Sequence, residues 1–473
     1  MSFDKTTLGE YAKVQGGFAY KSSDFLDFSS NKVLKIKNVR FGTIDYSEPG
    51  YISDQIAQET IKWKVKEGDI LISMTGSGPS APQSLVGRVA RVWKDEPEAW
   101  FNQRVGRICL LDETAIHPDF IFYWLSLPQS QDYLVSNSSG SANQANISGK
   151  TIESLPIPKV SYKTSERIAK LAKGFDEKLI LNNKINLILE QIVQAIFKSW
   201  FVDFEPVKAK IAALEAGGSV EGALLAAMQA ISGKDEVQLA LLQTKQPEQY
   251  IELRTIAKLF PSAMQDSELG KIPAGWRVSQ IGSEVTVVGG GTPSTKNPEF
   301  WDGGDIHWTS PRDLSNLANK VLIDTERKIT KIGLAKISSG LLPVNTVLMS
   351  SRAPVGYLAL AKIPVAINQG YIAMKCNKAL SPEFVIQWCS FNMDEIKGRA
   401  SGTTFAEISK KNFNTIPAIV PTLDIINIYT KQSKSIYQKI EMLVRESTSL
   451  AGFRDALLPR LLSGSIVTEV VEA

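Results

Sequence analysis

The stretch that decides the fold occurs twice in this chain: residues 139–158 read SGSANQANISGKTIESLPIP, and residues 401–419 read SGTTFAEISKKNFNTIPAI. Both copies run from Ser-Gly through Ile-Ser to a proline that follows an apolar residue. Their separation is far longer than the roughly 20–50 residues that repeat in solenoid and propeller proteins. The match therefore predicts that a whole domain has been duplicated within the 473-residue chain.

Four further matches occur in the same order in the two halves of the chain. They are LGEYAKVQGG (8–17) with IGSEVTVVGG (281–290), VKEGDILIS (65–73) with LPVNTVLMS (342–350), Asn102-Gln103 with Asn368-Gln369, and the helix start at Pro118 with that at Pro382. The separation between partners is 273 residues at the first glycine (Gly9 and Gly282), 266 at Asn102 and Asn368, and 261 at Ile147 and Ile408. Such a drift is what small loop differences within one shared fold would produce. Short apolar strands before glycine turns, and helices that open on proline, predict a mixed fold for each copy.

A long amphipathic helix is predicted after each copy. Over residues 164–200, apolar residues recur mostly at steps of three and four, which places them in one stripe. The stripe consists of Ile168, Leu171, Phe175, Leu179, Ile185, Leu189, Ile192, Ile196 and Trp200. Such a helix would be about 55 Å long, so its stripe needs a partner beyond one small domain. The helix of the other copy is the obvious partner. Asn182 and Asn186 interrupt the stripe; they could fix the register of the two helices, but we expect them to be solvated.

The second helix carries the seven-residue spacing of a coiled coil at Ile436, Leu443, Leu450 and Leu457. We therefore predict an α+β fold with a pseudo-twofold internal repeat, in which two tandem α/β domains are separated by two long antiparallel coiled-coil helices. The expected parts are a first domain (1–160), a central helix (161–206), a helical insertion or linker (207–265, with a turn-rich entry at 266–276), a second domain (266–421), a C-terminal helix (422–464) and a frayed tail (465–473).

Composition and motifs argue against catalysis by this chain. The only histidines are His117 and His307, so a histidine-dependent triad or metal site would have to use one of them. Gly149-Lys150-Thr151 lacks the earlier glycine of a phosphate-binding loop, because Gln144 stands at that position. We expect no catalytic residue, no metal site and no cofactor in this chain.

The cysteines and the N-terminus point to the cytoplasm. Cys109, Cys376 and Cys389 have no metal-type spacing and fit a reducing compartment. The sequence shows no apolar signal core, and we expect no membrane-spanning segment. The net charge of +4 permits binding to nucleic acid without requiring it.

Basic, amide and hydroxyl side chains on predicted loops favour DNA as a ligand. Residues 31–40, NKVLKIKNVR, contain four basic residues and no acid, and their alternation suggests a strand with one basic face. Arginine and lysine neutralise phosphate, arginine can read guanine, and asparagine and glutamine can read adenine. A solvated strand face or a structural turn would explain many of these residues as well. The candidates are Lys35, Lys37, Arg40, Thr75, Ser77, Arg88, Asn102, Gln103, Arg104, Trp308, Thr309, Arg312, Ser350, Arg352, Asn368, Gln369, Thr403 and Thr404.

The layout also suits DNA. Two similar domains held apart by rigid helices would present two reading surfaces at a fixed separation, as a DNA site in two halves requires. Because the loops of the copies have diverged, the two half-sites should differ. Apolar residues at the helix ends would either cap the coiled coil or dock another subunit: Phe197, Trp200, Phe201, Phe204, Phe453, Leu457 and Leu458.

The chain resembles the specificity subunits of type I restriction–modification enzymes. The resemblance is carried by AIFKSWFVDFEP (195–206), ELGKIPAGW (268–276) and FRDALLPRLLSG (453–464), together with the two-copy layout. It covers essentially the whole chain outside residues 207–262.

The resemblance implies two target-recognition domains, each reading one half of a bipartite double-stranded DNA site. It implies that the helices set the spacing and dock two modification (methyltransferase) subunits that use S-adenosylmethionine. Restriction subunits that use ATP and Mg²⁺ would join through them. The alternatives are a stand-alone bipartite DNA-binding protein and an assembly scaffold that does not bind DNA.

Overall fold

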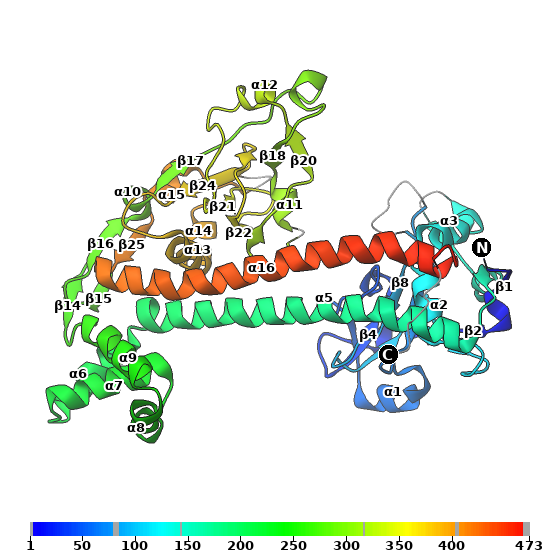
Figure 1. The fold of residues 1–473 in the computed structure, drawn as a ribbon, viewed down its shortest axis with the longest axis horizontal. Helices are drawn as coiled ribbons and strands as arrows, with labels where there is room; N and C mark the ends of the chain where they lie inside the picture. The colour runs from blue at the N-terminus through cyan, green and yellow to red at the C-terminus, as the bar shows by residue number, and fades with distance from the viewer. Residues whose placement is uncertain (1–2, 79–84, 142–143, 316, 403–405, 467–473) are drawn as a thin grey trace. The chain divides into compact units, whose positions relative to one another are not determined.

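The computed structural model describes residues 3–78, 85–141, 144–315, 317–402 and 406–466 (Figure 1). The chain forms two compact units, one of Met1–Leu179 with Ser449–Ala473 and the other of Ile180–Thr448. We call them unit 1 and unit 2. Each unit contains one copy of the repeat.

The repeated Ile-Ser segment folds in the same way in both units. Ser148 caps helix α4 (Gly149–Glu153) by accepting a hydrogen bond from the amide of Thr151 at 3.1 Å, and Ser409 caps α15 (Lys410–Asn414) by accepting one from Asn412 at 3.1 Å. Each helix then leads into a short strand that begins with the matched proline, β13 (Pro156–Pro158) or β25 (Pro417–Val420). The repeated sequence therefore encodes a serine that caps a helix and a proline at which a strand begins.

The domain of unit 1 is built on short sheets. Its central sheet has the order β2-β10-β6-β8: Ala12–Gly16, Val105–Leu110, Ile70–Ser73 and Val89–Arg91. A second sheet has the order β3-β5-β4-β9: Phe25–Leu26, Gly50–Ile52, Asn31–Leu34 and Ala99–Phe101. The smaller sheets are β11-β12-β7 (Ser139–Ser141, Gln144–Asn146, Thr75–Gly76) and β1-β13, with β1 at Lys5–Thr7. The other helices are α1 (Asp54–Glu59), α2 (Pro118–Leu125) and α3 (Pro128–Ser136).

The domain of unit 2 repeats this plan. Its central sheet has the order β17-β24-β21-β22-β19: Thr286–Val288, Tyr371–Lys375, Val347–Ser350, Leu358–Ala361 and Val321–Leu322. A three-stranded sheet has the order β20-β18-β23: Arg327–Ile329, Ile306–Thr309 and Ala366–Ile367. Strand β16 (Arg277–Gln280) pairs with β25. The helices are α10 (Ile281–Glu284), α11 (Pro311–Ser315), α12 (Lys331–Leu334), α13 (Pro382–Phe391) and α14 (Met393–Gly398).

Sheet topology confirms the predicted internal repeat. The antiparallel run β2-β10-β6-β8 of the first copy corresponds strand by strand to β17-β24-β21-β22 of the second. A parallel pair also recurs, β4 with β9 and β18 with β23. The matched helices α2 and α13 both begin at the predicted proline and are almost entirely buried. The duplication is therefore a duplication of fold.

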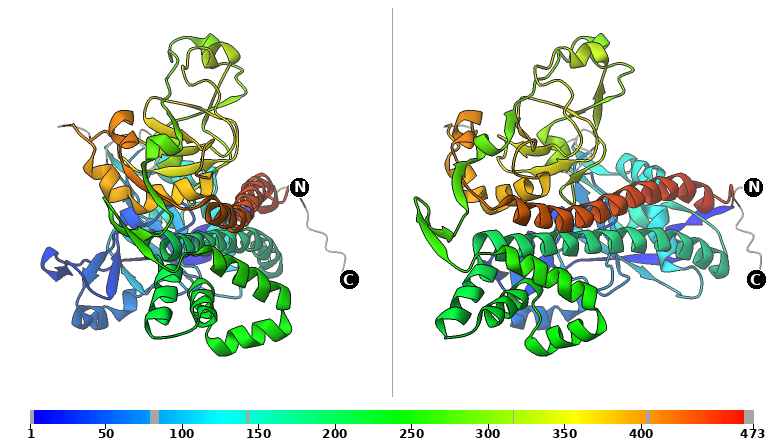
Figure 2. Two further views of the ribbon diagram at one scale, coloured as in Figure 1. Left: turned by 90° about the vertical axis from the view of Figure 1, so that its left-hand side faces the viewer. Right: turned by 60° about the vertical axis from the view of Figure 1, so that its left-hand side comes forward.

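Both long helices exist, with bounds close to the prediction. Helix α5 spans Tyr162–Phe197 and continues into a π-helical turn at Lys198–Val202, and α16 spans Leu423–Leu462. In unit 2 they run antiparallel, because Asn182 lies beside Glu446 while Phe197 packs against Tyr429 (Figures 1 and 2). In unit 1 they meet where Arg454 binds Asp176.

The buried face of α5 is more polar than we expected. Asn182 and Asn186 are 0% and 2% exposed, so the prediction that they are solvated is wrong. The Asn182 amide donates to Glu446 Oε2 at 2.8 Å and to Ser447 Oγ at 3.1 Å, because α16 supplies polar partners there. Conversely, Leu171 and Ile192, which were assigned to the apolar stripe, are both 43% exposed.

Residues 205–259 form four helices: α6 (Glu205–Glu215), α7 (Val220–Ser232), α8 (Glu236–Lys245) and α9 (Pro247–Leu259). They enclose a small core of their own around Leu224, Met228 and Leu239, which the prediction of a helical insertion had not included. The predicted turn-rich linker at 266–276 is wrong in part. The hairpin of β14 (Met264–Ser267) and β15 (Gly270–Pro273) occupies most of it, because a two-residue turn at Glu268-Leu269 lets the flanking strands pair.

One described helix, Tyr162–Val202, is by length and composition apolar enough to cross a membrane, with a mean hydropathy of 1.2 over its most apolar window. The expectation that no segment passes this test was therefore wrong. The helix carries Asn182, Asn186 and Glu190 on its buried face, and polar or ionisable groups are costly in a bilayer. Its buried polar residues pack against other parts of unit 2 instead.

Candidate nucleic-acid interface

A tight turn at residues 102–105 projects the predicted Asn-Gln pair of unit 1. The amide of Asn102 donates to Leu34 O at 2.9 Å, that of Gln103 to Phe18 O at 2.9 Å, and that of Val105 to Asn102 O at 2.8 Å. Gly17 packs so closely that a Cβ at this position would lie 2.1 Å from Asn102 O. The turn is thus fixed by its own backbone and by a neighbouring glycine.

Two other loops of unit 1 are bonded to this turn. The amide of Met74 donates to Arg104 O at 2.8 Å, and the amide of Ile147 donates to Met74 O at 3.0 Å. Pairing of β7 with β12 places Thr75 beside Asn146, and their side-chain oxygens are 2.8 Å apart in a hydrogen bond donated by Thr75. We call residues 73–77, 102–105 and 144–147 the first loop cluster.

The same backbone bonds recur in unit 2. The amide of Asn368 donates to Thr309 O at 3.0 Å, that of Ser351 to Gly370 O at 2.8 Å, and that of Ile408 to Ser351 O at 3.0 Å. A Cβ on Gly290 would lie 1.9 Å from Ile367 O. We call residues 350–353, 368–370 and 406–408 the second loop cluster. The loops are therefore held by one shared backbone frame.

Different side chains stand on this shared frame. Where the first loop cluster has Thr75 beside Asn146, the second has an ion pair in which Arg352 Nη1 lies 3.6 Å from Glu407 Oε2. Where the first has Arg104, the second has Gly370. A constant backbone with variable side chains suits two ligands that share a chemistry but differ in detail.

The side chains of the Asn-Gln pairs are accessible. Asn102 is half-buried, and Gln103 and Arg104 are exposed; in the described ranges none of these side chains forms a hydrogen bond or ion pair with another residue. In unit 2, Gln369 is exposed and its Oε1 accepts a hydrogen bond from Thr292 at 2.6 Å, while Asn368 Oδ1 accepts from the amide of Gly370 at 2.8 Å. Both pairs therefore lie where a ligand could reach them.

The basic face expected over residues 31–40 does not exist. Strand β4 ends at Leu34 and a 3₁₀ turn follows at Ile36–Asn38, so the alternation breaks. Lys37 pairs with Glu48 at 2.8 Å and Arg40 with Asp45 at 3.1 Å, because the following loop folds its acids back onto them. Lys35 lies 4.1 Å from the centroid of the Phe25 ring.

Several predicted DNA-binding side chains support the loops from inside. Arg88 is buried and donates to Ile36 O, and Thr75 is buried beneath its own loop. Three candidates of unit 2 are also buried: Trp308 donates to Gly291 O, Thr309 bonds Tyr371, and Ser350 donates to Pro354 O. Their burial contradicts direct contact with DNA, and it arises from strand pairing over distances that a local pattern does not show.

The remaining candidate residues differ in how exposed they are. Arg312 is exposed, with Nε 3.6 Å from Glu326 Oε2, and Ser77, which belongs to the first loop cluster, is half-buried. Thr403 and Thr404 lie outside the described residues.

The predicted docking residues of the central helix are also buried. Phe197, Trp200, Phe201 and Phe204 belong to the core of unit 2, where they pack around Tyr429 and Trp276. Leu458 is buried and Leu457 half-buried, whereas Phe453 is 62% exposed.

The prediction missed an exposed apolar stripe on α5, formed by Leu181, Ile188 and Ile192, because it did not name the first two and assigned Ile192 to the buried stripe. These side chains are 49%, 55% and 43% exposed. Their spacing of seven and four residues puts them on one face of the helix and could have been read from the sequence.

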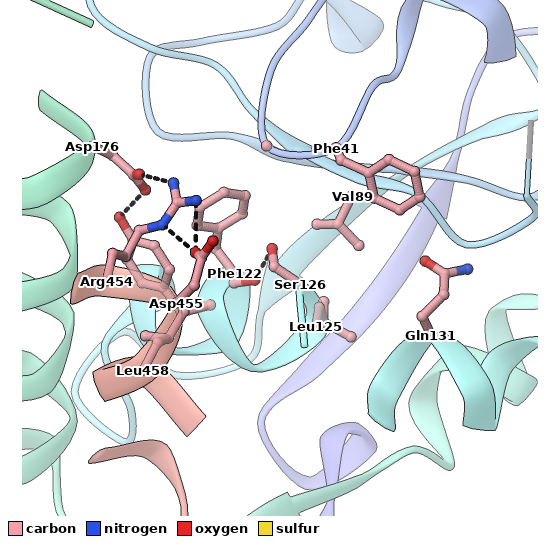
Figure 3. Close-up of a pocket in the computed structure, with 12 residues that line it drawn as sticks. Phe41, Val89, Phe122, Leu125, Ser126, Gln131, Asp176, Arg454, Asp455 and Leu458 are labelled. Carbon is pink, nitrogen blue, oxygen red and sulfur yellow. Dashed lines mark hydrogen bonds and ion pairs between the residues drawn. The ribbon is translucent and has the colours of Figure 1, made fainter. Parts of the chain in front are cut away.

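A pocket in unit 1 contains charged groups that are engaged with one another (Figure 3). The Tyr123 hydroxyl donates to Asp176 Oδ2 at 2.7 Å, and Arg454 Nη1 donates to Asp176 Oδ1 at 2.5 Å. Burial raises the pKa of Tyr123 well above its usual value, so the hydroxyl remains a neutral donor. The group joins α2, α5 and α16 within unit 1, and each oxygen of the Asp176 carboxylate accepts a hydrogen bond in it.

The histidines have structural settings. His117 caps α2 by accepting a hydrogen bond from the amide of Asp119 at 3.2 Å, as predicted from its place before Pro118. His307 Nδ1 lies 3.1 Å from Thr325 Oγ1. Within the described ranges, no group of three or more His, Cys, Asp or Glu side chains could hold a metal ion.

Comparison with known proteins identifies the fold and its role. A family model described as the type I restriction modification DNA specificity domain matches residues 2–191 and 273–450. The chain belongs to this family. The two matched ranges correspond to the two copies of the repeat, and the whole helical insertion lies between them. The chain is a specificity subunit of a type I restriction–modification system.

Individual relatives agree. The chain is 34% identical over 362 residues to the type I restriction enzyme HindI specificity subunit of Haemophilus influenzae, covering 74% of this chain and 77% of that protein. It is 35% identical over 160 residues to the MjaIX specificity subunit of Methanocaldococcus jannaschii, covering 33% and 37%. The crystal structure of the type I S subunit from M. genitalium has the same fold, with a TM-score of 0.52 at 15% identity, covering 98% of this chain and 96% of that one.

Proposed function

We propose that this specificity subunit reads a bipartite double-stranded DNA site, with the first loop cluster on one half-site and the second on the other. The observation that carries the proposal is the shared backbone frame with different side chains. A shared backbone frame presents each cluster to the same kind of ligand, and the exposed position that Arg104 occupies in the first cluster is Gly370 in the second, which changes which bases fit. Base edges are read by such side chains, while phosphate contacts set position.

The chain acts with partners that supply the chemistry. We propose that two modification (methyltransferase) subunits dock on the long helices, where Leu181, Ile188, Ile192 and Phe453 are exposed. Restriction subunits join this complex. S-adenosylmethionine, ATP and Mg²⁺ are bound by those partners, and this chain holds no cofactor and performs no catalysis. The complex works in the cytoplasm, where the DNA is.

The test is to express the chain with its modification subunit and map methylated adenines across the host genome. A motif of two short specific halves separated by a nonspecific spacer is expected, and it should vanish when this chain is omitted. Replacing residues 1–160 with the matching domain of another specificity subunit should change one half of the motif and leave the other intact. Methylation without a two-part motif would contradict the proposal.

The exposed stripe distinguishes this function from that of a stand-alone DNA-binding protein. Three large apolar side chains on one helix face, in a chain that needs no partner, would promote aggregation. A chain that bound its site specifically and remained soluble without the modification subunit would favour the stand-alone reading.

A further inference from the structure

We propose that Arg104 and Gln103 read base edges in the first half-site, and that Arg104 specifies a G·C pair that has no counterpart contact in the second half-site. This inference rests on the proposed DNA-reading function. It assigns two specificity-determining residues within the first loop cluster.

Arg104 differs from the other arginines of its domain. Arg91 is buried in an ion pair with Asp119 at 2.6 Å, Arg107 binds Asp69 at 3.0 Å, and Arg40 binds Asp45 at 3.1 Å. Arg88 is buried with its guanidinium on Ile36 O. Arg104 is exposed, and among the described residues no partner is recorded for its side chain. Its guanidinium is therefore available to an external ligand without first breaking an ion pair.

The backbone beneath Arg104 is held at three points. Its carbonyl accepts from Met74 at 2.8 Å, the preceding amide of Gln103 donates to Phe18 O, and Gly17 packs against Asn102. Direct reading of a base needs this rigidity, since a paired hydrogen bond is lost when its donor shifts by a fraction of an ångström. An exposed lysine or arginine on an unsupported loop would suit phosphate contact instead.

The side-chain chemistry matches base edges. The guanidinium fork of arginine bonds O6 and N7 of guanine together, and the glutamine amide bonds N6 and N7 of adenine. Adjacent exposed residues on one turn would reach neighbouring base pairs. The first half-site should therefore contain a guanine next to, or one step from, an adenine contacted by Gln103.

The second loop cluster lacks this contact. Gly370 occupies the position of Arg104, and a Cβ built there would lie 3.1 Å from Cγ of Pro311. Gln369 already accepts a hydrogen bond from Thr292 Oγ1. The same turn thus presents an extra base-reading cation in the first copy alone.

The experiment uses the full chain in complex with its modification subunit and three variants: Arg104→Gly, which installs the residue of the second copy, Arg104→Lys and Gln103→Ala. The readout is the genome-wide methylated motif and the relative methylation of oligonucleotides altered at each position of both half-sites. We expect Arg104→Gly and Arg104→Lys to relax one G·C position of the first half-site by about tenfold or more. Gln103→Ala should relax an adjacent position, and the second half-site should stay unchanged.

Matched controls separate the possible outcomes. Lys13→Ala removes an exposed cation that is paired with Glu153 in the same domain, and it should leave the motif intact. If Arg104→Gly lowers methylation evenly at every sequence while Arg104→Lys behaves as wild type, Arg104 contacts phosphate and the inference is overturned. An unchanged motif in all variants, or a change in the second half-site, overturns it as well. Failure of the wild-type complex to give any two-part motif would instead overturn the proposed function.

Discussion

At the scale of single residues, two glycines hold the reading turns. A Cβ on Gly17 would lie 2.1 Å from Asn102 O, and one on Gly290 would lie 1.9 Å from Ile367 O, so backbone would have to move. We expect Gly17→Ala and Gly290→Ala each to lower the free energy of unfolding by about 1–3 kcal/mol or more. Denaturant unfolding measures this. Their neighbours Gly16 and Gly291 have open space at Cβ and serve as matched controls; equal losses at Gly16→Ala would refute the explanation.

The sequence predicted the turn residues better than the residues around them. Asn102-Gln103 and Asn368-Gln369 were found because the repeat aligned them, and both pairs remain accessible. Trp308 was misplaced because its burial depends on β18 pairing with strands from other parts of the chain. Residue type gives chemistry, but exposure follows from tertiary pairing that no local window contains.

Glu284 makes the stability of unit 2 depend on pH. Its carboxylate accepts from Arg277 Nη1 at 2.7 Å, Nη2 at 2.8 Å and Ser279 Oγ at 2.6 Å. The hydrogen bonds from Arg277 hold the pKa of Glu284 below its usual value. A lowered folded pKa contributes stability above the unfolded pKa of about 4.3, and this is lost as the pH falls through the folded value.

The acid limb of the stability profile tests this account. Replacing Glu284 with glutamine should lower the thermal midpoint at neutral pH and flatten its fall between about pH 5 and 3. The same replacement at the exposed Glu268 is the control, and it should leave the profile unaltered. A wild-type slope retained in the Glu284→Gln variant would show that other carboxylates dominate.

At the scale of elements, the sequence predicted where the long helices begin and end, but not which of their side chains are buried. Periodicity located α5 to within a few residues, yet Leu171 and Ile192 are exposed while Asn182 and Asn186 are buried. A helix with apolar residues on more than one face can bury any of these faces, and the elements that pack against the helix determine which face is buried. In unit 2 these are the polar side chains of Glu446 and Ser447.

Asn186 is a weak point of that interface. It is 2% exposed, and within the described ranges neither its Oδ1 nor its Nδ2 has a hydrogen-bond partner. An unsatisfied buried amide costs about 1–3 kcal/mol, so Asn186→Leu should raise the free energy of unfolding by a similar amount. Asn182→Leu is the contrasting variant and should lower it, because Glu446 and Ser447 lose their bonds. Chemical denaturation of both proteins decides the matter: destabilisation by Asn186→Leu would indicate that the amide has a role.

At the scale of the whole molecule, duplication explains why one chain contains two similar domains, each with a loop cluster at the matching place in its fold. Each copy supplies its own sheets, its own loop cluster and one long helix, and both helices contribute residues to both units. The repeat was visible in the sequence because the cap and the turn need particular residues. The location of the docking surface was not visible in the sequence, because the aromatic residues at the end of α5 are buried in the core of unit 2.

The exposed stripe of Leu181, Ile188 and Ile192 is where a partner subunit would gain most from binding. These side chains contribute little to the folded chain because about half of each remains in water. Replacing all three with glutamine should change the stability of the free chain by less than about 1 kcal/mol. It should nevertheless abolish copurification with the modification subunit, since burying apolar surface drives association. Leu187→Gln is the matched control, because Leu187 is 60% exposed on a different side of α5. Retained copurification by the triple variant, or its loss with Leu187→Gln alone, would place the docking surface elsewhere.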